Sequence, residues 1–319
     1  MHVLGVDAGG SKTVALLADG SGHVIAEARG GGANLQVHGE LEVEKTLHAV
    51  IDELLSAHHV TPAAACLGIA GVDREQDGQT IRNIIRRLGF RERALIVNDA
   101  LIALVAGGGV GPGLVLISGT GSIAYGVSPA GVAARAGGWG SALGDEGSAY
   151  WVGRRALAAV TRDADGRGPA TRLTALVLEQ LSLSRPQQLI AAIYDGRHDP
   201  RTIAELAAVV ERARAQGDSV ATEILSDAAA ELALTASSVV TRLSMREAQF
   251  PTFLSGGMLR STPWLAAEVT RQLEAVAPRS PISLLDVEPA VGAVRLALAE
   301  AEGRAKVPQY LDAVSPTHS

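Results

Sequence analysis

Apolar residues occur in two patterns along this chain: short continuous runs, and longer segments in which they recur every three or four positions. A run of four to eight apolar residues is typical of a buried β-strand, and the wider spacing is typical of a helix. In the first third of the chain the two patterns predict strands at residues 2–6, 13–18, 23–28, 64–70 and 94–97, and helices at 43–55, 79–88 and 100–106. The resulting order, β-β-β-α-β-α-β-α, predicts an α/β fold.

A glycine-rich run at residues 107–113 interrupts this pattern and is the predicted hinge between two halves. The second half begins again with three expected strands, at residues 114–117, 122–127 and 132–136. A long helical segment follows at about 146–243, with weak breaks near Gly166, Pro186 and Pro200. The remaining expected elements are a strand at 252–254, a Gly-Gly turn at 256–257, a helix at 263–276, a strand near 282–285, a helix at 289–302 and a loosely ordered tail after Lys306.

Composition narrows the class of protein. With 319 residues, 47% of them hydrophobic, the chain can bury a large core, which suggests about two domains. Its 28 Lys and Arg against 34 Asp and Glu give a formal charge of −6, so no basic excess indicates a nucleic acid or membrane partner. No apolar run reaches about eighteen residues and no leader pattern precedes the first strand, so we expect a cytoplasmic protein. The single cysteine, Cys66, cannot form an internal disulfide or a cysteine metal cluster.

Two glycine-rich turns each follow a predicted buried strand. The first Gly turn (residues 7–13) has the sequence Asp-Ala-Gly-Gly-Ser-Lys-Thr, and the second Gly turn (residues 118–122) has the sequence Ser-Gly-Thr-Gly-Ser. Successive backbone N–H groups in such turns can form an anion-binding nest. One turn alone is a weak phosphate signal, because short motifs often match by chance. Two of them suggest a duplicated domain that holds a polyphosphate from both sides.

Asp7 and Lys12 are the charged residues of the first Gly turn. A carboxylate would repel a neighbouring phosphate unless a cation intervened, so we interpret Asp7 as a Mg²⁺ contact, through water, in preference to a residue that merely opens a turn. Lys12 either neutralises phosphate charge or is a solvated strand residue, and the sequence leaves these alternatives equal.

Asp99 follows the predicted strand at residues 94–97 and precedes a helix. It is either a helix N-cap or a general base that takes a proton from an attacking hydroxyl, since α/β sheets place ligands beyond the carboxyl ends of their strands. Its position alone leaves both roles open. The glycine-rich stretch at residues 30–34 likewise is either a linker or a ligand loop with Asn34 as its polar contact.

The most unusual segment is residues 137–148, in which glycines flank an isolated Trp139. It is either a capped helix after a loop or a sugar site, with an aromatic ring beside carboxylates that accept hydroxyl hydrogen bonds. The third Gly turn (residues 254–259) is either a plain tight turn or backbone that a planar base can approach closely. We interpret the histidines near the first helix as surface or satisfied residues; they are His38, His48, His58 and His59.

Together these motifs resemble the sugar kinase, actin and Hsp70 superfamily. Within it the chain is similar to the BadF/BadG/BcrA/BcrD-type ATPases, and most closely to the N-acetylglucosamine kinases among them. The resemblance extends from the first strand to about residue 300. Its most specific part is GGWGSALGDEGSAYW at residues 137–151, and the other motifs in family order are VNDA at 97–100, LISGTGS at 116–122 and LSGGM at 254–258.

The resemblance implies two ribonuclease-H-like (actin-like ATPase) domains with an interdomain cleft and a helical insertion in the second. The implied domains are residues 1–110 with 290–319, and residues 111–289. ATP and Mg²⁺ are the implied cofactors, with Asp7 as the metal residue. The residues matched to nucleotide binding are Asp7, Gly9, Gly10, Ser11, Lys12, Thr13, Ser118, Gly119, Thr120, Gly121, Gly256 and Gly257. The resemblance makes Asp99 the catalytic base, and the residues matched to sugar contacts are Asn34, Asn98, Asp99, Trp139, Gly140 and Asp145.

The implied function is transfer of phosphate from ATP to the 6-hydroxyl of an amino sugar, foremost N-acetylglucosamine, with glucosamine or N-acetylmuramic acid as alternatives. An ATPase activator of a redox enzyme is a rival, but such activators hold an iron–sulfur cluster with two cysteines per chain. A non-catalytic sensor is disfavoured by the intact Asp7, Asp99 and Gly turns. A homodimer is expected only because symmetric dimers are the commonest oligomers.

Overall fold

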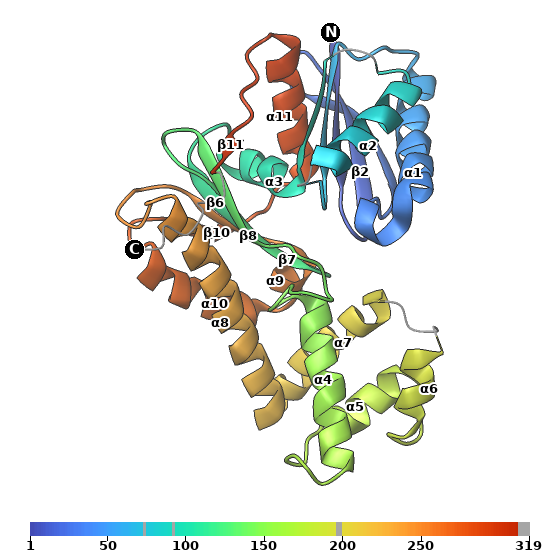
Figure 1. The fold of residues 1–319 in the computed structure, drawn as a ribbon, viewed down its shortest axis with the longest axis vertical. Helices are drawn as coiled ribbons and strands as arrows, with labels where there is room; N and C mark the ends of the chain where they lie inside the picture. The colour runs from blue at the N-terminus through green and yellow to red at the C-terminus, as the bar shows by residue number, and fades with distance from the viewer. Residues whose placement is uncertain (73–74, 91–92, 196–199, 312–319) are drawn as a thin grey trace. The chain divides into compact units, whose positions relative to one another are not determined.

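A computed structural model of the chain describes residues 1–72, 75–90, 93–195 and 200–311. Its contacts divide the chain into a first unit, Met1–Val115 with Tyr125–Ala134 and Leu285–Ser319, and a second unit, Leu116–Ala124 with Arg135–Leu284. The strands form two sheets, of order β3-β2-β1-β4-β5 and β10-β9-β6-β7-β8-β11 (Figure 1). This is the mixed α/β architecture that the alternating patterns predict.

The first sheet combines a hairpin with parallel strands. Its members are β1 (His2–Ala8), β2 (Lys12–Asp19), β3 (Val24–Gly31), β4 (Ala64–Ile69) and β5 (Ala94–Asn98). β1, β2 and β3 pair antiparallel, whereas β1, β4 and β5 are parallel. Parallel neighbours require a crossover connection, and α2 (Glu75–Arg87) supplies it between β4 and β5. The carboxyl ends of β1, β4 and β5 therefore lie at one edge of this sheet.

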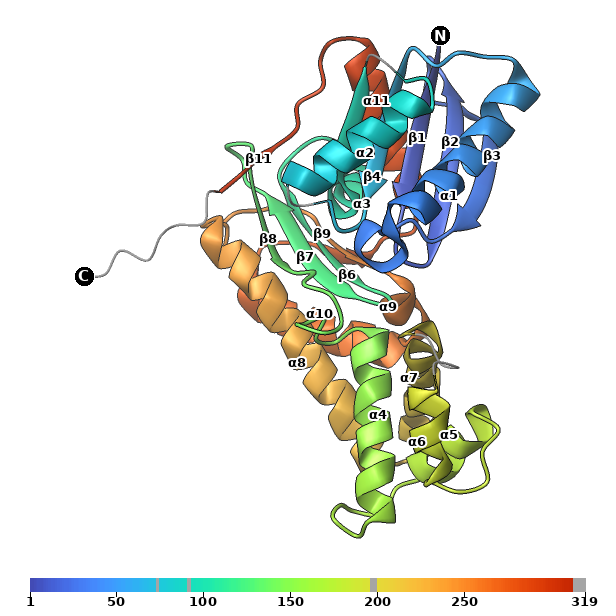
Figure 2. The same ribbon diagram turned by 45° about the vertical axis from the view of Figure 1, so that its right-hand side comes forward.

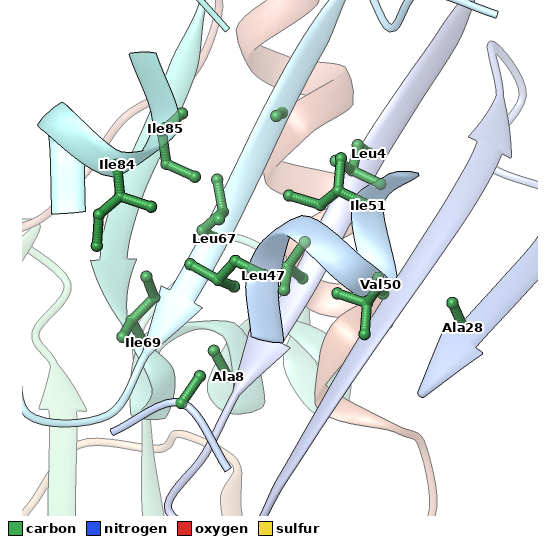
Figure 3. Packing of buried hydrophobic residues seen from close by; sticks show 14 of the residues in the cluster. Leu4, Ala8, Ala28, Leu47, Val50, Ile51, Leu67, Ile69, Ile84 and Ile85 are labelled. Carbon is green, nitrogen blue, oxygen red and sulfur yellow. The ribbon is translucent and has the colours of Figure 1, made fainter. Parts of the chain in front are cut away.

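Helices cover both faces of the first sheet (Figures 1 and 2). One face packs against α1 (Leu35–His58) and α2, and the other against α3 (Asp99–Gly108) and α11 (Pro289–Ala301). Figure 3 shows Leu47 of α1 and Ile84 of α2 packed with Leu67 of β4 in the buried core of the first face. On the other face a Cβ at Gly5 would lie 2.5 Å from the Val294 backbone nitrogen, so α11 lies directly on β1. Successive side chains of a strand point to opposite faces of the sheet, so the helices on the two sides bury the side chains of both faces.

Along the chain, helices separate several strands of the second sheet. Its strands are β6 (Gly113–Ser118), β7 (Ser122–Val127), β8 (Val132–Gly137), β9 (Thr252–Ser255), β10 (Ile282–Leu284) and β11 (Gln309–Tyr310). Between β8 and β9 the described residues form α4 (Ala149–Ala164), α5 (Leu173–Gln180), α6 (Gln188–Tyr194), α7 (Pro200–Ala215) and α8 (Ser219–Arg242). Between β9 and β10 lie α9 (Gly257–Ser261) and α10 (Pro263–Val276).

Among the described residues, α8 is long and apolar enough to pass a length-and-composition test for a membrane span. Half of its most apolar window is buried inside the fold (50%), and α8 packs against α7 and α10. Fully buried residues such as Leu225 and Leu232 form its core side. This is the pattern of a core helix, so α8 is weak evidence for a membrane.

Two expectations about local structure were wrong, and one helix break had not been expected. Gly30 and Gly31 are not part of a linker, because β3 continues through Gly31, which pairs with Lys12. The tail after Lys306 is ordered as far as residue 311: β11 pairs with β8, and the Leu311 N–H donates to the Ala133 carbonyl at 2.8 Å. A further helix break, at residue 217, separates α7 from α8. In the two strand cases distant segments supply the hydrogen-bond partners, which a local pattern cannot reveal.

Candidate active site

The first Gly turn joins β1 to β2 at the carboxyl end of β1. Ala8 pairs with Thr13 across this hairpin, and the Gly9 N–H donates to the Lys12 carbonyl at 2.9 Å. Asp7, the first residue of the turn, is only 8% exposed. The turn therefore places exposed backbone next to a buried carboxylate, which suits the predicted phosphate and Mg²⁺ contacts.

Two polar side chains of the first Gly turn have partners within the first unit. Lys12 forms an ion pair with Glu288, with its Nζ 2.5 Å from Oε1, and the Lys12 side chain is half exposed. The Thr13 hydroxyl donates to the Gly31 carbonyl at 2.8 Å, and Thr13 is fully buried. Lys12 is thus ion-paired, not merely solvated. Its contact with phosphate, and that of Thr13, stay predictions.

Asp7 and Asp99 lie at the same edge of the first sheet. Gly68 of β4 is the register partner of both Asp7 in β1 and Val97 in β5. β5 is two strands away from β1, which is about 10 Å for strands about 4.8 Å apart. Asp99 follows shortly after Val97, beyond the carboxyl end of β5. The fold thus brings the predicted metal carboxylate and the predicted base to the edge where α/β sheets bind ligands.

Asn98, and not Asp99, caps α3. The Asn98 side-chain oxygen accepts the Ala100 N–H at 2.8 Å, and the Asn98 backbone is extended. Asp99 is the first residue of the helix and is partly exposed. Capping the helix was the alternative role that the sequence left open for Asp99, and Asn98 has that role instead. The role of Asp99 as a general base stays a prediction.

Asn34 lies beside the first Gly turn. It follows β3, and the preceding Ala33 N–H donates to the Gly9 carbonyl at 2.9 Å. A Cβ at Gly71, which follows β4, would lie 3.3 Å from the Asn34 Oδ1. Sequence reasoning missed Gly71, although a glycine directly after a predicted strand was the available signal. Asn34 is therefore placed among the loops at the carboxyl edge of the first sheet.

Buried hydroxyl groups hold the second Gly turn. The Ser118 hydroxyl donates to the Gly147 carbonyl at 2.9 Å, and the Ser122 hydroxyl donates to the Glu146 carbonyl at 2.7 Å. The Ala149 N–H, at the start of α4, donates to the Gly119 carbonyl at 2.8 Å. The second Gly turn is thus bonded to the last part of the tryptophan-containing segment.

The third Gly turn is in direct contact with the second. Gly256 has a φ of +98°, and a Cβ there would lie 2.2 Å from the Ser118 carbonyl oxygen. A Cβ at Gly119 would lie 3.8 Å from the Gly257 nitrogen. Only glycine permits the first of these approaches. The predicted phosphate residues and the predicted adenosine residues are therefore neighbours within the second unit.

The remaining predicted sugar residues of the second unit differ in exposure. Asp145 is 7% exposed, and its carboxylate accepts hydrogen bonds from the backbone N–H groups of Ser122 and Gly140. Burial raises the pKa of Asp145, and these two hydrogen bonds oppose the rise. Trp139 is 62% exposed, with the Arg135 guanidinium 5.2 Å from its ring centroid. Asp145 thus organises the loop from inside, while Trp139 presents its ring outward.

Within the described part of the chain, no group of three or more His, Cys, Asp or Glu is placed to hold a metal ion. His48, His58 and His59 are exposed, and the His38 ring is bonded to the Gly10 carbonyl. Cys66 is buried in β4, and burial raises the pKa of its thiol. The histidines and Cys66 therefore behave as surface, satisfied or core residues.

Comparisons with known proteins show what the chain is similar to. The profile of the BadF/BadG/BcrA/BcrD ATPase family matches residues 4–297. The N-acetylmuramic acid/N-acetylglucosamine kinase of Clostridium acetobutylicum is 36% identical over 94% of this chain and 99% of its own length. The N-acetyl-D-glucosamine kinase of Dictyostelium discoideum is 32% identical over 92% and 97%. A candidate N-acetylglucosamine kinase structure from Chromobacterium violaceum has a TM-score of 0.73 and 26% identity, over 93% and 98% of the two chains.

Proposed function

The chain belongs to the BadF/BadG/BcrA/BcrD ATPase family, and from this membership we propose that it transfers phosphate from ATP to an amino sugar. N-acetylglucosamine is the favoured substrate, because both kinases compared above carry it in their names. N-acetylmuramic acid is the second candidate, since the Clostridium acetobutylicum enzyme is named for it as well. Glucosamine is the third.

The observation that carries the proposal is the placement of Asp99. Asn98 takes over the capping of α3, so the helix does not need the Asp99 carboxylate as its cap. The carboxylate instead lies at the carboxyl edge of the sheet that also carries Asp7. In the proposed reaction Asp99 accepts the proton of the sugar 6-hydroxyl as its oxygen attacks the γ-phosphorus and ADP leaves. General base catalysis of this kind contributes roughly 10²–10⁴-fold.

The nucleotide contacts are assigned separately in each unit. In the first unit the backbone N–H groups of Gly10 and Ser11 bind phosphate oxygens, in the manner of an anion nest, while the Gly9 N–H donates to the Lys12 carbonyl. In the second unit the second Gly turn binds phosphate, and Gly256 with Gly257 lies against the adenosine. Because phosphoryl transfer depends mainly on positioning and on stabilising charge, rigid backbone donors are suitable groups.

The sugar contacts are assigned to residues whose surroundings differ. Asn34 and Asn98 offer amide groups in the first unit, and the Asn98 oxygen also accepts the Ala100 N–H at the start of α3. In the second unit Trp139 offers an exposed ring face and Gly140 a backbone group. Asp145 is buried, so its effect on the sugar includes the shape it gives the surrounding loop.

The donor set fits Mg²⁺ held chiefly by phosphate and water. Mg²⁺ usually keeps several waters and takes one or two carboxylates together with substrate phosphates. Asp7 is one such carboxylate, buried beside the first Gly turn. When bound, the ion neutralises phosphate charge. The chain's own part is to keep the Asp7 carboxylate at the start of the turn.

The redox-activator alternative is weaker. An iron–sulfur cluster is held by cysteine thiolates. The chain has the single Cys66, which is buried, and burial raises the pKa of its thiol. The two-domain division at residues 1–110 with 290–319 and 111–289, a homodimer and a cytoplasmic location are further proposals.

An assay of ADP formation from ATP, with and without each of the three amino sugars, tests the proposed function. We expect ADP formation to require a sugar and the product to be the sugar 6-phosphate, identified by phosphorus–proton coupling. Equal ADP formation without sugar would favour the activator, and no turnover with any sugar would favour a sensor. The Asp99→Asn variant is the matched control for contaminating kinases.

A further inference from the structure

The segment after β3 is hydrogen-bonded to two consecutive carbonyl groups of the first Gly turn. The Ala33 N–H donates to the Gly9 carbonyl at 2.9 Å. The His38 Nε2 lies 3.0 Å from the Gly10 carbonyl oxygen. Because a carbonyl oxygen only accepts, Nε2 carries the hydrogen in this contact. His38 is half-buried near the start of α1, so its ring is held against the turn.

These two contacts determine where the N–H groups of the turn point. A trans peptide is planar, and its N–H points opposite to its carbonyl. The bond to the Gly9 carbonyl therefore directs the Gly10 N–H away from Ala33. The bond to the Gly10 carbonyl directs the Ser11 N–H away from His38. Successive N–H groups held in this way are the groups from which a backbone anion site is built.

Close packing at Gly32 shows that the His38 contact belongs to a tight arrangement. A Cβ at Gly32 would lie 2.2 Å from the Gly10 carbonyl oxygen and 2.6 Å from the His38 Nε2. A Cβ at the neighbouring Gly31 would meet no atom within 4 Å. The segment after β3 thus packs closely against the first Gly turn at Gly32. The neighbouring Gly31, which has open space, provides a matched control.

On the basis of the proposed kinase function, we propose that His38 is a positioning residue for ATP. By holding the Gly10 carbonyl it keeps the Gly10–Ser11 peptide in the orientation that directs the Ser11 N–H toward a phosphate oxygen. Glycine adopts φ of either sign with little cost, so a peptide next to it reorients easily when nothing holds it. Without the imidazole donor this peptide loses one of its contacts, and nucleotide binding has to offset the cost of the added freedom.

A merely structural role for His38 has a different consequence. If the ring only stabilised the start of α1, its loss would lower the melting temperature and the amount of folded enzyme. The KM for ATP of the folded enzyme would then be unchanged. The KM for ATP, measured apart from kcat and from the KM for sugar, therefore separates the two roles.

The test compares three variants of His38 in the intact chain. His38→Gln keeps a side-chain N–H donor, whereas His38→Ala and His38→Phe lack one. We expect the KM for ATP to rise about three- to tenfold in the Ala and Phe variants and to stay within about twofold in the Gln variant, as the loss or retention of one hydrogen bond implies. The KM for sugar stays within about twofold in all three.

Two control variants accompany this set. His48→Ala removes an exposed histidine from the part of α1 that follows a kink at Gly39, and is expected to leave both KM values unchanged. Gly32→Ala displaces the Gly10 carbonyl and is expected to raise the KM for ATP, whereas Gly31→Ala has open space and is not. A parent-like KM for ATP in His38→Ala, or a Gln variant as impaired as the Ala variant, would overturn the proposal.

Failure of the proposed function is recognised separately. If the parent protein consumes no ATP with any of the sugars, the dissociation constant of a non-hydrolysable ATP analogue is measured by calorimetry for the same variants. The same weakening of about three- to tenfold in the Ala and Phe variants, restored by Gln, then supports the role of His38 without the kinase reaction. A parent protein that binds no nucleotide overturns both proposals.

Discussion

The first and second Gly turns have the same sequence pattern, a glycine-rich turn after a buried strand, but their glycines meet different surroundings. A Cβ at Gly10 in the first turn would meet no atom within 4 Å. A Cβ at Gly121 in the second would lie 2.7 Å from the Asp145 Oδ2, and one at Gly256, in the third Gly turn that contacts the second, would lie 2.2 Å from the Ser118 carbonyl oxygen. The protein's own packing therefore requires the latter two glycines but not Gly10.

This comparison separates two reasons for a glycine. Where the protein's own atoms fill the space that a Cβ would occupy, packing alone explains the glycine, and the glycine is then no evidence for a ligand. Where the space is open, packing does not explain the glycine, and the missing side chain leaves room for a ligand. At Gly10 the first Gly turn accordingly leaves room for the phosphate that we propose, while Gly121 and Gly256 belong to a compact cluster of loops.

The largest expected effect is on the chemistry beside the first Gly turn. In Asp99→Asn the side chain keeps its shape but cannot accept a proton, so turnover should fall by roughly 10²–10⁴-fold. The free energy of unfolding should change by less than about 0.5 kcal/mol, because Asn98 still caps α3. Single-turnover kinetics and urea denaturation measure the two quantities. Near-parental turnover, with the chemical step rate-limiting, would exclude Asp99 as the base.

The second-largest expected effect is a loss of stability when Gly256 of the second unit is replaced by alanine. Gly256→Ala places a Cβ 2.2 Å from the Ser118 carbonyl oxygen at a φ of +98°, so the free energy of unfolding should fall by about 3 kcal/mol. Gly257→Ala, whose Cβ would meet no atom within 4 Å, is the matched control for stability. Urea denaturation without nucleotide gives the comparison. Equal urea midpoints for the two variants would show that the loops around Gly256 rearrange at little cost to accept the added methyl group.

In the first Gly turn an added methyl group should affect ATP binding and leave stability unchanged. In Gly10→Ala the added methyl has open space, so the free energy of unfolding should change by less than about 0.5 kcal/mol. The KM for ATP should rise roughly tenfold, equivalent to about 1.4 kcal/mol, because the methyl obstructs the approaching phosphate. Steady-state kinetics with ATP varied measures this. A variant that is destabilised while its KM for ATP is unchanged would reverse the comparison.

The smallest effect concerns the pH dependence of stability in the second unit. Burial raises the pKa of Asp145, so between the ordinary Asp value of 3.8 and the raised value the folded protein binds more protons than the unfolded one. The free energy of unfolding contributed by Asp145 is therefore greatest below pH 3.8, falls as the pH rises, and levels off above the raised pKa.

Asp145→Asn does not titrate, so this fall should be absent from its profile. Urea denaturation of the parent and the variant, repeated from about pH 4 to about pH 7, gives the difference between the two profiles. Taking the difference removes the contribution of other carboxyl groups such as Asp218. Burial raises the pKa of Asp218, but several hydrogen bonds from its neighbours together lower it further, so its net pKa is below the ordinary value. Parallel profiles would show that Asp145 is solvated in solution.

Elements with a strong local signal were predictable from the sequence. The helix expected at residues 263–276 and α10 have the same bounds, and the helix expected from Pro289 forms α11. In both, an apolar period begins at a proline suited to a first helical turn. β11 had no such signal, because Gln309 and Tyr310 are exposed and form a strand only through pairing with β8.

The sequence by itself determined most of the order of strands and helices, the family to which the motifs belong, and the residue types placed at each turn. Only the tertiary structure decided which side chains are already engaged. Lys12 meets Glu288 from 276 positions away, Asn98 takes the cap instead of Asp99, and Asp145 is buried. The physical reason is that hydrogen bonds, ion pairs and burial depend on partners brought together by folding, whereas strand and helix patterns depend on neighbours along the chain.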